Sequence, residues 1–133
     1  MNKNIKKLCI LEGGASFQPK AWLRVTGEDA LSFLQGQFTQ ELREGKSPAV
    51  NYGWWLNQKG KVLADSWVLR VSANECWIWS AFSPAATIQA RLEAFIIADD
   101  VVIEDLTEEF GGLVLAGTEG RARIEAAGID APA

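Results

Sequence analysis

The sequence predicts an α+β fold with a mostly antiparallel sheet. Three observations predict it: short extended runs bounded by turn residues, two segments with helical spacing and clear start signals, and the order in which these segments follow one another. That order is strand, helix, three strands, helix, strand, strand, helix. We expect the 133 residues to form a single domain, because this length can bury a real core but leaves little room for a second.

The first predicted strand, Ala21–Val25, leads into a predicted helix over Gly27–Phe38. Thr26 and Asp29 have the spacing of a capping box, which marks the start of this helix. Its apolar stripe then ends in the unusual string Gln35-Gly36-Gln37. The glycine would permit a left-handed turn or a close backbone approach, and the two amides could bind helix carbonyls or the polar edge of a ligand.

A meander of three strands is predicted next. A polar loop over 43–48 contains the breakers Gly45 and Pro48, and extended runs follow at about 49–56, 61–71 and 75–82. The short separators 57–60 and 72–74 have turn composition, so the three runs are expected to pair as two hairpins.

The second helix has the clearest start signal in the chain. Ser83 supplies a capping hydroxyl and Pro84 suits the first turn, and helical spacing continues through Ile88, Leu92, Phe95 and Ile96 until Asp99-Asp100. Strands at about 101–106 and 112–116 and a final helix at about 118–127 complete the predicted order.

The predicted strands are apolar on both faces. In the run Cys76–Phe82, Cys76, Ile78 and Phe82 point one way, while Trp77, Trp79 and Ala81 point the other. A free-standing antiparallel sheet usually has one polar face, and two helices can cover only one side. The tryptophans therefore either fold into one compact core or form a face that packs on a partner or on a missing part of the protein.

Composition excludes several classes of function. The 13 basic residues are dispersed among 17 acidic ones, for a net charge of −4, so no basic surface for nucleic acid is expected. No stretch is long enough to span a bilayer and the basic N-terminus lacks a signal-peptide core, which together predict a cytoplasmic protein. The absence of histidine rules out a His-based triad and the usual zinc ligands, and Cys9 and Cys76 are expected to be buried thiols. We therefore predict no metal site.

Two strings in this order carry a family resemblance: VTGEDALSFLQGQFTQEL, and LNQKGKVLADSWVL after it. They resemble the YgfZ family of folate-binding proteins, relatives of the glycine cleavage T-protein, an aminomethyltransferase. The likeness extends through IADDVVIEDLT and GLVLAG, from about Ala21 to Ala127.

The resemblance implies a tetrahydrofolate-binding fold whose first half is a β-α-β(3)-α unit paired with a second such unit. On this view the chain is a fragment or a truncated relative. The tryptophan-rich face of its strands would then pack on a missing second half-domain or on a homodimer partner. The Lys-Gly-Cys-Tyr-x-Gly-Gln-Glu signature of the YgfZ family has no match here. Activity that depends on its cysteine is not expected of this chain.

Three functions are to be weighed, of which the resemblance implies the first two and the tryptophan face suggests the third. The first is folate-dependent maintenance of iron-sulfur enzymes or of tRNA-modifying enzymes, without obligatory turnover. The second is transfer of a one-carbon group to tetrahydrofolate, as in the T-protein. The third is an interaction module that dimerises through its tryptophan face and binds no small molecule.

Asp65 is the main candidate site residue. It corresponds to one of two adjacent acids in T-proteins, and Ala64 replaces the other. Burial among apolar strand neighbours would raise its pKa and suit it to general acid or base chemistry on a pterin, although it could equally be an exposed carboxylate without a role.

Further candidates line the implied folate cavity. Tyr52 could stack on a flat ring and Asn57 could pair with its edge, although Asn57 also opens a turn. Gln35 and Thr39 are possible polar contacts, and Lys59 and Lys61 could attract a glutamate tail. Trp54 and Trp55 are expected in the core rather than on a ligand. Ser80 lies where T-proteins tend to carry asparagine, which weakens the case for aminomethyl transfer.

Overall fold

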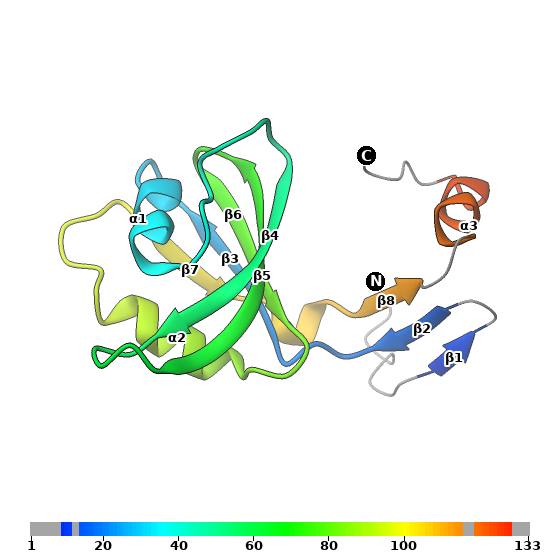
Figure 1. The fold of residues 1–133 in the computed structure, drawn as a ribbon, viewed down its shortest axis with the longest axis horizontal. Helices are drawn as coiled ribbons and strands as arrows, with labels where there is room; N and C mark the ends of the chain where they lie inside the picture. The colour runs from blue at the N-terminus through cyan, green and yellow to red at the C-terminus, as the bar shows by residue number, and fades with distance from the viewer. Residues whose placement is uncertain (1–8, 12–13, 116–118, 129–133) are drawn as a thin grey trace. The chain divides into compact units, whose positions relative to one another are not determined.

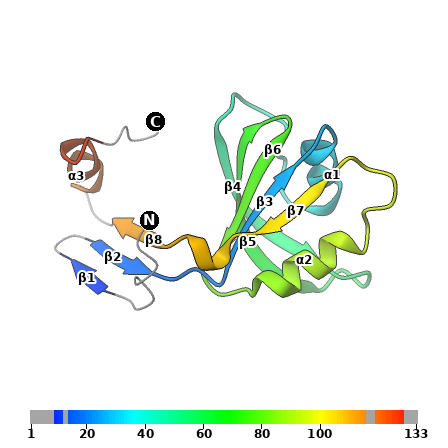
Figure 2. The same cartoon turned by 180° about the vertical axis from the view of Figure 1, so that it is seen from behind.

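The chain divides into two units, of which the larger spans residues 19–107 and the smaller combines residues 1–18 with 108–133. The structure is a computed structural model that describes residues 9–11, 14–115 and 119–128. Each unit is described by itself below, and Figures 1 and 2 show the course of the chain through both.

The larger unit contains a five-stranded sheet in the order β4-β5-β6-β3-β7, and every pairing in it is antiparallel. Its elements are β3 Ala21–Thr26, α1 Ala30–Gln37, β4 Ala49–Leu56, β5 Val62–Ser72, β6 Glu75–Ser80, α2 Ala85–Glu93 and β7 Val102–Asp105. The short 3-10 helix η1 Thr107–Glu109 begins at Thr107, the last residue of this unit. The predicted α+β class is confirmed, and so is the predicted order of strands and helices within this unit.

Helices α1 and α2 pack on one face of this sheet (Figure 1). The core that they close is fully apolar at its centre, and its fully buried members include Leu23, Val25, Leu34, Trp55, Val68, Ile78, Ile88 and Leu92. These residues alternate along β3, β5 and β6, as the period of a strand requires. We call the opposite side of the sheet the outer face.

The smaller unit pairs a hairpin with a strand from the far end of the chain. Strands β1 Cys9–Leu11 and β2 Gly14–Phe17 pair with each other, and β2 also pairs with β8 Gly112–Leu115. Helix α3 Gly120–Ala126 follows. The sequence did not predict β1 and β2, because their runs are too short for a clear alternation. The predicted burial of Cys9 lies outside the residues whose side chains the structure describes.

The start of α1 differs from the predicted capping box. Asp29 makes no side-chain cap bond, and its Oδ2 accepts instead from Asp100 N–H at 2.7 Å. In return, Asp100 Oδ2 accepts from Glu28 N–H at 3.1 Å. Thr26 ends β3 in place of capping the helix. The carboxylates therefore join the start of α1 to the segment before β7.

Gly27 makes this junction possible. Its φ is +130°, and an added Cβ would lie 2.0 Å from the Asp100 carbonyl oxygen. No other residue type combines that backbone conformation with that approach.

The predicted α2 is confirmed but ends earlier than expected, at Glu93. Bonds of the tighter i to i−3 type at Phe95 and Ile96 replace further α-helical turns. Phe82 also departs from the prediction: β6 ends at Ser80, and Phe82 is 84% exposed rather than aligned with Ile78 in the core.

Candidate functional site

Asp65 lies in β5 at the centre of a hydrogen-bond network that joins three elements. Tyr52 of β4 donates its hydroxyl to Asp65 Oδ2 at 2.6 Å. Two serines donate to the other oxygen, Oδ1: Ser83, from the turn between β6 and α2, at 2.6 Å, and Ser80, the last residue of β6, at 3.2 Å. A three-donor arrangement of this kind stabilises the ionised carboxylate.

The pKa of Asp65 is consequently lowered, whereas burial among apolar neighbours, the first of the two alternatives considered, would have raised it. The Ser83 hydrogen bond is the largest cause, followed by that of Tyr52, and both outweigh the opposing effect of burial. The raised pKa was inferred from apolar strand neighbours, but the donors come from residues 13, 15 and 18 positions away in the chain. Asp65 is thus a carboxylate at neutral pH, suited to accept hydrogen bonds and poorly suited to donate a proton.

A row of aromatic side chains crosses the outer face beside Asp65. Tyr52 pairs in register with Trp67, Trp67 with Trp79, and Trp79 with Trp22, so that four adjacent strands each contribute one ring. Tyr52 and Trp67 have ring centroids 5.1 Å apart, and Trp67 and Trp79 stack at 6.2 Å with planes 14° apart. We call these four residues the aromatic row.

The row remains partly open to solvent at its Asp65 end. Tyr52 is 41% exposed, Trp67 38%, and Trp54, which pairs with Asp65 across β4 and β5, 46%. Large half-exposed rings beside a carboxylate are typical of surfaces that bind a flat, polar-edged ligand or a partner. The two-sided tryptophan strands predicted from the sequence are therefore present, with Trp77 and Trp79 on the face opposite Cys76 and Ile78.

The two neighbouring tryptophans of β4 have different surroundings. Trp55 is fully buried, contacts Phe38 at a centroid distance of 4.6 Å, and donates its indole N–H to Ser66 at 2.9 Å. Core packing was predicted for both, and it is correct for Trp55 and wrong for Trp54. Because side chains alternate along a strand, only one of two consecutive residues can enter the core.

Gln35 and Thr39 hold the chain that follows α1. Gln35 Oε1 accepts from Leu42 N–H at 2.6 Å. Thr39 Oγ1 accepts from Trp54 N–H at 2.8 Å, and the Thr39 amide donates to the Trp54 carbonyl at 3.3 Å. Thr39 therefore adjoins Trp54 at the edge of the candidate site, while Gln35 contacts the loop.

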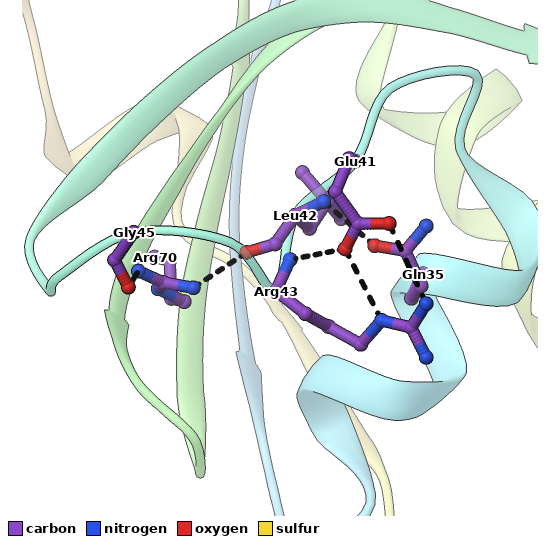
Figure 3. Close-up of polar contacts among 6 residues, drawn as sticks. All are labelled: Gln35, Glu41, Leu42, Arg43, Gly45 and Arg70. Carbon is purple, nitrogen blue, oxygen red and sulfur yellow. Dashed lines mark hydrogen bonds and ion pairs between the residues drawn. The ribbon is translucent and has the colours of Figure 1, made fainter.

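Arg70 anchors the same loop from inside the core (Figure 3). It is only 3% exposed, and its Nη1 and Nη2 donate to the carbonyls of Leu42 and Gly45 at 2.8 and 2.7 Å. Leu42 is thus held at its N–H by Gln35 and at its carbonyl by Arg70. The sequence contained no signal for this contact, because the donor and its acceptors are 25 to 28 residues apart.

The glycine and second amide of Gln35-Gly36-Gln37 have separate roles. Gln37 Oε1 accepts from Arg91 Nη1 of α2 at 2.9 Å, and Arg91 Nε donates to the Leu56 carbonyl at 2.7 Å. Gly36 lies within α1, and a Cβ there would meet nothing within 4 Å. The expected left-handed turn or close approach at Gly36 is therefore absent, and the amides, not the glycine, connect this helix to its neighbours.

Asn57 forms the hairpin turn between β4 and β5. Its Oδ1 accepts from the backbone N–H groups of Lys59 and Lys61 at 2.8 and 3.0 Å. Both lysines are exposed in that hairpin. The turn alternative considered for Asn57 is thus realised, and contact of these three residues with a ligand stays a prediction.

Ser83 contacts Asp65 instead of the helix that it was predicted to cap. It was predicted to cap α2, yet the cap position is Pro84 and no side-chain cap bond forms there. Trp67 was not among the residues predicted to contact a ligand. Its position two residues after Asp65 in the same strand could have indicated that the two side chains lie on the same face, because residues i and i+2 share a face.

Neither cysteine chemistry nor a metal cluster is found at the site. Cys76 is fully buried and unbridged, and burial raises the pKa of its thiol to about 11, so it is not a thiolate at neutral pH. Among the described residues, no three His, Cys, Asp or Glu side chains are grouped so that they could hold a metal ion. Nor does that part of the chain contain a helix long and apolar enough to cross a membrane.

Comparison with solved structures supports the fold. The glycine cleavage system aminomethyltransferase T from Bartonella henselae superposes with a TM-score of 0.74 at 22% sequence identity, over 84% of this chain and 30% of that one. An uncharacterized protein from Aquifex aeolicus (strain VF5) is 27% identical over 90 residues, which are 68% of this chain and 59% of the relative. The chain thus spans well under two thirds of either protein.

A family model described as the GCVT N-terminal domain matches residues 18–131. This match includes all five strands of the larger sheet, both helices that cover it, and Asp65 with its three hydrogen-bond donors. The chain therefore belongs to the GCVT N-terminal domain family.

Proposed function

We propose that the chain binds tetrahydrofolate on the outer face of its five-stranded sheet, where the aromatic row meets Asp65. The observation that carries this proposal is an ionised carboxylate beside half-exposed rings, in a member of a family related to a folate-dependent transferase.

The residues present fit the chemical groups of a folate. A reduced pterin keeps a flat pyrimidinone ring whose 2-amino-4-oxo edge carries adjacent N–H donors, and a carboxylate is their natural acceptor. Asp65 Oδ2 receives one side-chain donor, from Tyr52, and therefore keeps acceptor capacity. Tyr52, Trp54 and Trp67 supply aromatic surface on which a flat ring can stack.

The charge state of Asp65 favours binding over proton donation. A general acid needs a pKa near the working pH, and the pKa of Asp65 is lowered from its ordinary 3.8. We therefore infer a folate-binding role of the YgfZ type, in maintenance of iron-sulfur or tRNA-modifying enzymes in the cytoplasm, ahead of aminomethyl transfer.

The outer face is proposed to be covered in the functional assembly. Its rings are too exposed for a face that is permanently in water, since large apolar patches are rare on monomers. A second half-domain of the T-protein kind is the partner that the family relation suggests. A second copy of this chain is the alternative, and light scattering at high concentration distinguishes the two.

Calorimetric titration of the folded chain with tetrahydrofolate tests the proposal. We expect saturable binding that Asp65→Asn weakens by about tenfold or more, the effect of losing one charge-assisted hydrogen bond. Asp99→Asn, which removes an exposed carboxylate outside the site, is the matched control and should bind like the original chain. Failure to bind by a chain with a cooperative unfolding transition, or equal affinity of Asp65→Asn and the control, would overturn the proposal.

A further inference from the structure

The end of β6 and the turn that follows it place two serine hydroxyls on one oxygen of Asp65. Ser83 Oγ donates to Asp65 Oδ1 at 2.6 Å and also accepts from the Asp65 backbone N–H at 3.0 Å. This exchange closes a ring between the side chain of Ser83 and both the backbone and the side chain of Asp65. A ring of this kind restrains the rotamer of the carboxylate as well as its position.

Ser80 reinforces the arrangement from the core side. It is only 2% exposed, and its Oγ accepts from the N–H groups of Phe82 and Ser83 at 3.4 and 3.0 Å. Because those amides use the acceptor sites of the hydroxyl, its single proton is directed to Asp65 Oδ1 at 3.2 Å.

We propose that Ser83, supported by Ser80, is a positioning residue that occupies Oδ1 of Asp65 and leaves Oδ2 as the oxygen that receives a ligand's N–H groups. The ligand in this statement rests on the proposed function, whereas the restraint on Asp65 is a property of the chain alone.

The division between the two oxygens supports this assignment. Oδ1 receives both serines, whereas Oδ2 receives only the tyrosine hydroxyl, which comes from β4. The side chain of Tyr52 belongs to the aromatic row, so it brings its hydroxyl to Asp65 from the ligand side.

The helix start supports it independently. The hydroxyl oxygen of a serine immediately before the first turn of a helix usually accepts a hydrogen bond from an amide N–H of that turn. Here α2 begins without any side-chain cap bond, and the Ser83 hydroxyl is directed to β5 instead. The local sequence favours a cap, and the tertiary structure uses the same group to hold the carboxylate.

The consequence is a specificity rule for the site. Asp65 is kept as an acceptor-only group. Among the described residues Tyr52 is the only titratable side chain that bonds to it, and its other two side-chain donors are the hydroxyls of Ser80 and Ser83. The site should therefore accept a ligand edge with N–H donors and reject an edge that carries negative charge.

Titration of the Asp65 carboxyl carbon by NMR in the ligand-free chain tests the positioning role directly. We expect a low pKa in the original chain, an upward shift in Ser83→Ala and a return to the low value in Ser83→Thr, which restores the hydroxyl. Ser32→Ala, which removes a hydroxyl of α1 bonded only to the Asp29 carbonyl, is the control and should leave Asp65 unchanged. If Ser83→Ala does not fold, Ser83→Cys replaces it with a weak donor of similar size and makes the same test.

Tetrahydrofolate affinity, measured in parallel near pH 7, separates the two proposals. We expect Ser83→Ala to bind at least several-fold more weakly than the original chain and Ser83→Thr to recover affinity. An unchanged Asp65 titration in Ser83→Ala would overturn the positioning role, whether or not folate binds. A shifted titration in a chain that binds no folate would uphold the positioning of Asp65 and overturn the proposed ligand.

Discussion

The hydroxyl of Tyr52 in β4 donates to Asp65 Oδ2 in the neighbouring strand β5 at 2.6 Å. Asp65 lies two residues before Trp67, the in-register partner of Tyr52. This bond stabilises the protonated phenol and the ionised carboxylate together. It lowers the pKa of Asp65 and, as the largest single cause, raises the pKa of Tyr52 above its ordinary 10.0.

Tyr52 is the single tyrosine of the chain, so its ionisation can be followed without interference from another phenol. In the original chain we expect tyrosinate absorbance, followed near 295 nm, to develop above pH 10. In Asp65→Asn it should develop at lower pH, because the charged acceptor of the phenol proton is gone. Coincident titration curves of the two proteins would show that the bond does not exist in solution.

Asp65 also links stability to pH. Because its folded-state pKa is lowered, its contribution to the free energy of unfolding is fully present above its ordinary pKa of 3.8 and is lost as pH falls through the lower folded-state value. In urea unfolding at pH 7 and at pH 3, Asp65→Asn should therefore lose less stability relative to the original chain at pH 3 than at pH 7. An equal difference at both pH values would contradict the lowered pKa.

Gly27→Ala should be strongly destabilising. Its φ of +130° and the 2.0 Å approach to the Asp100 carbonyl leave no room for a Cβ, and strain of this kind costs roughly 2–4 kcal/mol. Thermal or urea unfolding measures the loss.

Gly36→Ala provides the matched control for that substitution. Gly36 lies inside α1 with open space around it, and alanine there should stabilise the chain by about 0.5–1 kcal/mol. Similar effects of the two alanines would show that the junction between Gly27 and Asp100 is not as close as described.

Arg70→Met should release the loop that follows α1. The substitution keeps much of the apolar stem but leaves the carbonyls of Leu42 and Gly45 without their guanidinium donor, at a cost of roughly 2–3 kcal/mol. Limited proteolysis should then cut within 39–48 much faster.

Arg43→Met is the control for the loop. Arg43 is exposed and pairs with Glu41 in the same loop (Figure 3), so its removal should leave the free energy of unfolding nearly unchanged. Equal protease sensitivity of the two variants would remove the anchoring role of Arg70.

Gln37→Ala should weaken the contact between α1 and α2. Arg91 loses one acceptor but keeps the Leu56 carbonyl, so a loss of about 1 kcal/mol is expected in urea unfolding. Unchanged stability and unchanged tetrahydrofolate affinity would show that the C-terminal end of α1 contributes neither to packing on α2 nor to the folate site.

Much of the fold could be predicted from local patterns. Extended runs bounded by turn residues at 61–71 and 75–82 predicted strands β5 and β6. Their apolar character on both faces pointed to a second apolar side of the sheet but left open whether the tryptophans pack in one core or form an outer face. These signals are local because the period of a strand or helix sets which side chains share a face. The family resemblance likewise depended on short strings and needed no coordinates.

The partners of the polar side chains could not be predicted in this way. Asp29 and Ser83 each have the sequence of a helix cap, yet one bonds to Asp100 and the other to Asp65. Asp65 itself, for which a raised pKa was one of two alternatives, has a lowered one because three hydroxyls reach it from β4, from the end of β6 and from the β6–α2 turn.

The spacing of neighbours in the chain thus accounts for the strands and helices of the larger unit and for the side of the sheet that most of their residues occupy, with Trp54 and Phe82 as exceptions. Which hydroxyls and amides meet which carboxylates and carbonyls depends on the tertiary structure. The physical reason is that a hydrogen bond requires its two atoms within about 3 Å of each other, and strand register, not local sequence, sets such distances between residues far apart in the chain.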